Sequence, residues 1–92
     1  MPKKKTPSRQ SARSNSDQRI VAALLATVRA ECDVTQTELA KRLGKPQSWI
    51  GKAEKAARRV DVLELMAICE ALRIDPSKFM QRLRRQMKKA RE

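Results

Sequence analysis

The chain has 92 residues, enough for one small domain, and carries 22 basic and 10 acidic residues for a net charge of +12. It contains no histidine, so a histidine base acting near neutral pH is excluded. We find no nucleophile motif, no phosphate-binding glycine loop and no set of metal ligands, and therefore predict no enzymatic activity, no metal and no cofactor. The positive charge favours an anionic partner, with nucleic acid first and an acidic membrane surface second.

The charge is concentrated at the two ends of the chain. Residues 1–16 contain five basic residues and no acid, residues 17–75 are nearly neutral, and residues 76–92 contain seven basic residues and one acid. The first segment has almost nothing to bury, so we predict a disordered basic arm over 1–16, with Lys3, Lys4 and Lys5 as candidate DNA contacts. After this arm we predict a folded domain over 17–80 and a basic helical extension over 81–92.

The first helix is predicted over about 17–31, with Ser16 as its N-cap. Apolar residues recur there with the spacing of one helical face, at Ile20, Val21, Leu24, Leu25 and Val28. The absence of long runs of β-branched residues favours an all-α fold throughout. No apolar stretch approaches the roughly 20 residues that a membrane span requires.

Two short helices come next, joined by a tight turn. Thr35 followed by Glu38 fits a capping box that opens the second helix, and Gly44 fits the left-handed residue that ends it. Pro46 suits the first turn of a third helix, over about 46–55. Isolated helices of this length are marginal in water, so both must pack on a scaffold. Their inner faces are Leu39, Ala40, Leu43, Ile50 and Ala53.

Two further helices complete the prediction. Asp61 with Glu64 caps a fourth helix, and Asp75-Pro76 opens a fifth. On the fifth, apolar residues recur at Phe79, Leu83 and Met87, with Met80 beside them. Cys69 lies in the apolar run of the fourth helix, where a packed thiol is expected, and with Cys32 it is predicted to stay reduced.

A short helix, a glycine turn and a second short helix form a helix-turn-helix unit. Residues 20–80 resemble the lambda-repressor-like, XRE-type helix-turn-helix family, through "TQTELAKRLGKPQSWIGKAE" followed by "RRVDVLELMAICEALRIDPSKF". The resemblance implies a five-helix DNA-binding domain whose third helix enters the major groove. It also implies a partly buried ion pair between Arg29 and Glu54.

The family pattern also assigns contacts to individual positions. Gln47, Ser48 and Lys52 match positions that meet base edges, and their side chains can bond to adenine or guanine. Gln36 matches a glutamine that touches a phosphate and braces the reading helix. Other candidate phosphate contacts, which position the protein without specifying sequence, are Lys45, Trp49, Lys55, Arg58 and Arg59. For Trp49, packing within the domain is the alternative.

Three positions depart from the family pattern. Gly51 stands where a side chain able to contact DNA is common, so it removes one contact or permits a close backbone approach. Ala56 stands where glycine usually follows the third helix, which predicts a slightly longer helix. Arg73 stands where glycine is usual, so a left-handed non-glycine residue is expected there.

The leading functional hypothesis is a cytoplasmic, bacterial or phage transcription regulator that represses by occupying a palindromic operator as a homodimer. Met80, Leu83 and Met87 are the candidate dimer interface, although part of this set must pack within the monomer. No small-molecule ligand is expected. Two alternatives stay open: an antitoxin-type autoregulator that also binds a protein partner, and a low-specificity binder of nucleic acid, RNA included, that acts through its charged ends.

Overall fold

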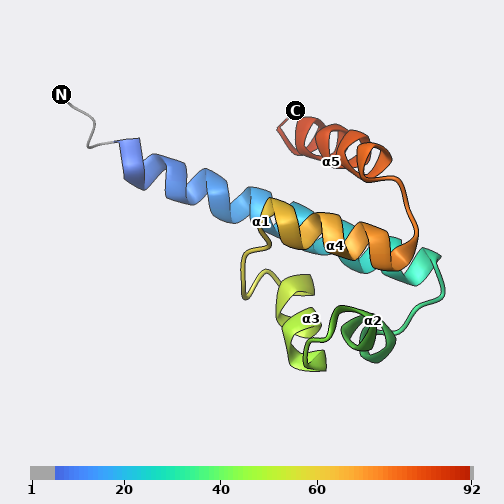
Figure 1. The fold of residues 1–92 in the computed structure, drawn as a ribbon. Helices are drawn as coiled ribbons and strands as arrows, with labels where there is room; N and C mark the ends of the chain where they lie inside the picture. The colour runs from blue at the N-terminus through green and yellow to red at the C-terminus, as the bar shows by residue number, and fades with distance from the viewer. Residues whose placement is uncertain (1–5, 92) are drawn as a thin grey trace.

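The computed structural model describes the backbone of residues 6–91 and the side chains from residue 16 onward. This part of the chain forms helices and no strand, which confirms the all-α, five-helix prediction. Figure 1 shows α2 and α3 together on one side of the molecule and α5 on the other. The helices are α1 (Thr6–Glu31), α2 (Gln36–Leu43), α3 (Gln47–Glu54), α4 (Val62–Leu72) and α5 (Pro76–Ala90).

The first helix begins earlier than the sequence predicts. α1 starts at Thr6, so residues 6–16 of the predicted disordered arm are helical, and Ser16 lies inside the helix and does not cap it. Extending a helix that is already nucleated costs little per residue, and residues 6–16 contain no glycine. The start of α1 projects beyond the bundle in Figure 1. The predicted arm contacts at Lys3, Lys4 and Lys5 lie outside the described residues.

The ends of α2 follow local chemistry. The Thr35 hydroxyl accepts from the Glu38 backbone N–H at 3.1 Å, which is one half of the predicted capping box. The other half is not formed, because the Glu38 carboxylate accepts from Arg42 instead, at 3.3 Å. Gly44 ends the helix in the left-handed region, at φ 67°, where a residue without Cβ carries no steric penalty. The chain can therefore turn into α3 directly after Pro46, its N-cap.

The capping box at the start of α4 is complete. Asp61 accepts from the Glu64 N–H at 2.8 Å, and Glu64 accepts from the Asp61 N–H at 2.9 Å. Arg73 then ends α4 at φ 60°, as expected for a position where glycine is usual. The prediction of a longer third helix is wrong, because α3 ends at Glu54 and Ala56 itself adopts a left-handed conformation at φ 61°. Asp33 is also left-handed, at φ 58°, and the sequence analysis did not predict this conformation there.

The core is aliphatic and lies where the helices meet. α1 packs on α3 and α5, and α4 packs on α2 and α5, so the two short helices are held by the longer ones. Ala40, 3% exposed, is the small residue between α2 and its neighbours. Further members of the core cluster are Leu24, Leu25, Val28, Leu39, Ile50, Ile68, Cys69, Leu72, Phe79 and Leu83.

Candidate nucleic-acid interface

Helix α3 presents one buried and one exposed face. Ile50 and Ala53 are 1% and 3% exposed, and they fix the helix on the bundle. Gln47, Ser48 and Lys52, the predicted base contacts, are all exposed. The fold therefore leaves one polar side of a rigidly packed helix open to solvent, which is the arrangement that a major-groove reading helix needs.

A line of hydrogen bonds connects α1 to the start of this exposed face. Arg29 donates to both carboxylate oxygens of Glu54, from Nε at 2.6 Å and from Nη2 at 3.0 Å, and donates from Nη1 to the Val34 carbonyl at 2.7 Å. Gln36 Nε2 donates to Glu54 Oε1 at 2.9 Å. Gln47 Nε2 then donates to Gln36 Oε1 at 2.6 Å. The predicted ion pair is thus present and supports a larger network.

The ion pair is nearly withdrawn from solvent. The side chains of Arg29 and Glu54 are 17% and 7% exposed. The hydrogen bond to Glu54 raises the pKa of the Arg29 guanidinium above its ordinary value, while burial acts in the opposite direction. Every side-chain N and O atom of Arg29 and Glu54 has a hydrogen-bond partner. The bonds from Arg29 hold the Glu54 carboxylate in place, and this carboxylate in turn orients the Gln36 amide.

The network also constrains the amide of Gln47. One of its two N–H donors is used by Gln36, which leaves the amide oxygen and the second N–H for an external partner. An oxygen acceptor beside an N–H donor matches the N6 and N7 edge of adenine. Gln47 is therefore held in a geometry suited to bidentate base recognition.

Trp49 packs against the core cluster and carries two cations over its indole ring. Lys45 Nζ lies 5.1 Å and Arg58 Cζ 4.5 Å from the ring centroid. Arg58 also donates to the Glu64 carboxylate at 3.2 and 3.4 Å, so its guanidinium is held on the protein. Trp49 therefore packs within the domain, which the sequence analysis gave as the alternative. Its indole ring also makes cation–π contacts with Lys45 and Arg58.

The remaining predicted phosphate contacts surround α3. Lys45, Lys55 and Arg59 are exposed, and Gln36 is half-buried because it belongs to the network. Folding adds a polar cleft beside Arg59, lined by Gln18, Arg19 and residues 56–59. Neither Gln18 nor Arg19 lies in the helix-turn-helix motif, and only the packing of α1 on α3 brings them to this surface.

Gly51 has room for a side chain in the free protein. A Cβ at this position would lie 3.7 Å from Gln47 Nε2 and 3.8 Å from Gln36 Oε1, which is ordinary van der Waals contact. The glycine is therefore not required by packing within the domain.

Comparison with known proteins places this geometry in a family. The helix-turn-helix family profile matches residues 25–79. An XRE-family like protein from Pseudomonas syringae pv. tomato has 36% sequence identity and a TM-score of 0.68, over 89% of this chain and 95% of that chain. The chain belongs to the XRE-type helix-turn-helix family. It is thus a member of a family of DNA-binding transcription regulators.

Other solved structures share the fold of this XRE-type protein. The clp gene regulator ClgR from C. glutamicum has 22% identity and a TM-score of 0.72, over 77% of this chain and 92% of that one. The restriction-modification controller protein C.AhdI from Aeromonas hydrophila has 25% identity and a TM-score of 0.65, over 70% of this chain and 97% of that chain. A search of curated protein sequences gave no significant match.

Other kinds of site were sought in the same part of the XRE-type chain. Over residues 6–91, no helix is long and apolar enough to cross a bilayer. The described residues also bring together no group of three or more potential metal ligands. Cys69 is fully buried, and burial raises the pKa of its thiol, as expected for a packed cysteine.

Proposed function

We propose that the protein is a sequence-specific regulator of transcription that reads double-stranded DNA through α3, binds a palindromic operator as a homodimer and represses by occupying the promoter. The observation that carries this proposal is the line of hydrogen bonds from Arg29 through Glu54 and Gln36 to Gln47. A preorganised polar side chain on an exposed helix face reduces the entropy lost when it binds a base.

Sequence discrimination is assigned to three side chains of α3. Gln47 offers an acceptor and a donor to adenine, Lys52 can donate to the O6 and N7 atoms of guanine, and Ser48 can serve either base. The three residues are exposed on the side of α3 opposite Ile50 and Ala53. They can therefore enter a groove about 12 Å wide without disturbing the core.

Phosphate contacts are assigned to the cations around α3. Lys45, Lys55 and Arg59 are exposed and can approach the DNA backbone directly. Gln36, Trp49 and Arg58 are proposed to contribute from more fixed positions, since each is half-buried and already bonded or packed within the domain. The cleft beside Arg59 adds Arg19 to this set.

The basic arm is proposed to contact DNA through Lys3, Lys4 and Lys5. Each phosphate neutralised on duplex DNA adds about 0.9 to the slope of log affinity against log salt. Deleting residues 1–16 removes five positive charges and is expected to flatten this slope. An unchanged slope would show that the arm does not touch DNA.

A homodimer is proposed because one short reading helix makes few contacts, and two half-sites about 34 Å apart double them. Of the predicted interface residues, Met80 is 47% exposed and Met87 is partly buried. Leu83 is 8% exposed and packs in the core of its own chain. The burial of Leu83 agrees with the expectation that part of this set packs within the monomer, and it leaves Met80 and Met87 as the candidate interface residues.

The decisive experiment is selection of bound duplexes from a random pool, followed by titration with the selected and scrambled sites. Gln47→Ala combined with Lys52→Ala should collapse the ratio of the two affinities. The matched control combines Gln81→Ala with Lys89→Ala, which removes the same side-chain types from exposed positions on α5. Equal wild-type affinity for both duplexes would contradict the proposal and favour a low-specificity binder.

A further inference from the structure

The last helix, α5, is strongly basic, and most of its cations have no acidic partner. Residues 76–91 contain seven basic residues and no acidic one. Arg82 pairs with Glu31 of α1 at 2.8 Å. Arg91 pairs with Asp17 of the same helix at 3.1 Å. Among the side chains that the structure describes, no salt bridge involves the other five cations.

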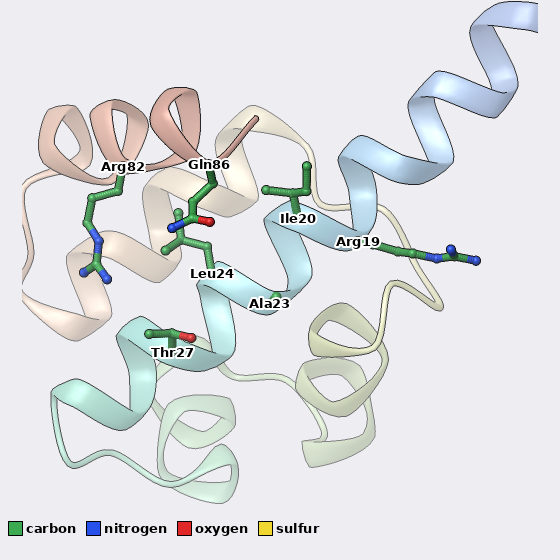
Figure 2. Close-up of a pocket in the computed structure, with 7 residues that line it drawn as sticks. All are labelled: Arg19, Ile20, Ala23, Leu24, Thr27, Arg82 and Gln86. Carbon is green, nitrogen blue, oxygen red and sulfur yellow. The ribbon is translucent and has the colours of Figure 1, made fainter. Parts of the chain in front are cut away.

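Three of these five cations lie together on the side of α5 that is turned toward solvent. Phe79 and Leu83 are 2% and 8% exposed and mark the buried side of the helix. Figure 2 shows Arg82 and Gln86 reaching from α5 toward α1, along a groove between the two helices. The remaining arc of the helix forms a hollow, which we call the outer face of α5. It is lined by four exposed residues, none of them acidic or apolar: Gln81, Arg84, Arg85 and Lys88.

The outer face of α5 holds like charges at short range. Lys88 follows Arg84 by four residues and Arg85 by three, the spacings at which side chains of a helix are neighbours. Like charges at such spacings destabilise a helix. Lys88 lies in the last turn, where a cation interacts favourably with the helix dipole, but both arginines lie before that turn. An anion bound at the outer face would relieve the repulsion.

The composition of the outer face favours a nucleic acid over a protein or a membrane. Protein interfaces have an apolar core and few lysines, whereas no apolar residue lines this hollow. A helix that binds a membrane surface needs an exposed apolar face. On α5 that face is buried with Phe79 and Leu83, and Met80 is the one exposed large apolar residue of the described helix. Phosphates require only closely spaced cations.

The outer face of α5 lies on the opposite side of the domain from the proposed reading helix. α3 packs on α1 and α2, and α5 packs on α1 and α4. Figure 1 shows α2 and α3 on one side of the molecule and α5 on the other, with α1 and α4 between them. A straight duplex seated on α3 is therefore separated from the outer face by the body of the domain.

We propose that the outer face of α5 binds the phosphate backbone of a second DNA duplex while α3 occupies the operator, so that the protein bridges two DNA segments. This inference rests on the DNA binding of the proposed function and adds a second, non-specific site to it. Contacts to phosphates carry no sequence information. The second duplex is therefore held by charge alone, whatever its sequence.

The test is capture of a labelled duplex of scrambled sequence by protein bound to immobilised operator, the duplex selected from the random pool. The wild-type protein should retain the labelled duplex, and this retention should weaken as salt rises. Arg85→Gln combined with Lys88→Gln should weaken it by at least about tenfold and lower the salt slope by about 1.8, since each phosphate contact contributes about 0.9. Affinity for the operator should stay within a few-fold of wild type.

The matched control combines Lys41→Gln with Arg73→Gln. It removes the same two side-chain types from exposed positions on α2 and at the end of α4. Retention of the second duplex and affinity for the operator should both equal those of the wild-type protein. Thermal unfolding of both double variants checks that they fold.

The outcomes separate the outer-face site from the proposed function. A wild-type protein that retains no second duplex, or retention that survives the Arg85 and Lys88 changes, would overturn the inference and leave operator binding standing. If the double variant lost affinity for long operator duplexes but not for ones trimmed to the protected footprint, the cations would contact the flanks of the same duplex, which also overturns it. Equal affinity of the wild-type protein for selected and scrambled duplexes would overturn only the proposed function, because capture can still be measured between two scrambled duplexes.

Discussion

Glu54→Gln tests whether the Arg29–Glu54 ion pair stabilises the domain and fixes Gln36 and Gln47 at the proposed reading helix, α3. The variant keeps the size of the side chain and removes its charge and one acceptor. Glu54 accepts two hydrogen bonds from Arg29, at 2.6 and 3.0 Å, and one from Gln36 at 2.9 Å. A glutamine can accept at one oxygen only, so at least one donor of a largely buried guanidinium is left facing an N–H group.

The expected cost follows from burial. Breaking a buried pair by removing one partner destabilises by about 3–5 kcal/mol, because the survivor stays charged and unpaired. Arg29 is 17% exposed and keeps its bond to the Val34 carbonyl, which places the cost at the lower end, about 3 kcal/mol. For a domain of this size, 3 kcal/mol lowers the melting temperature by on the order of 15 °C.

The assay is thermal unfolding of the variant beside Glu38→Gln. Glu38 also pairs with an arginine, but the two side chains are 54% and 39% exposed, so its loss should cost less than about 0.5 kcal/mol. The Glu54 variant should additionally lose sequence discrimination, because Gln36 no longer holds Gln47. Equal melting temperatures for the two variants would refute this account of the network.

Three smaller predictions concern helix interiors, helix ends and pH. Gly51→Ala should raise stability in denaturant titrations by about 1 kcal/mol, since alanine favours the helix and its Cβ has room. Arg73→Gly should stabilise by roughly 0.5–1 kcal/mol in the same assay, because glycine relieves the left-handed strain at φ 60°. The backbone N–H of Asp61, and then Arg58, lower the pKa of Glu64 below its ordinary value of 4.5. That stabilisation is present above pH 4.5 and is lost as the pH falls through the lowered pKa, so the melting temperatures of wild type and Glu64→Gln should converge on acidification.

Local chemistry in the sequence determined most of the helix ends. Gly44 and the pair Asp61 and Glu64 act through bonds within a few residues, so their roles do not depend on the rest of the fold. The same holds for Asp75 with Pro76, which opens α5 as predicted. The helix-turn-helix motif follows from helical period and turn chemistry. The resemblance to the XRE-type family singled out Gln47, Ser48 and Lys52, and all three are exposed.

Tertiary structure decided what depends on partners distant in the sequence. The left-handed conformation of Ala56 is not signalled locally, because the reversal of the chain after α3 depends on how the packed segments are held. The stacking of Arg58 on Trp49 required the loop after α3 to fold back over that helix.

The sequence alone determined that the chain forms an all-α helix-turn-helix protein whose third helix has a polar outer face, since periodicity and caps are properties of neighbouring residues. Only the folded structure decided that Glu54 links Arg29 to Gln36, and that Gln18 and Arg19 of α1 line a cleft beside Arg59. Such contacts join residues on different helices, and their geometry is set by how those helices pack.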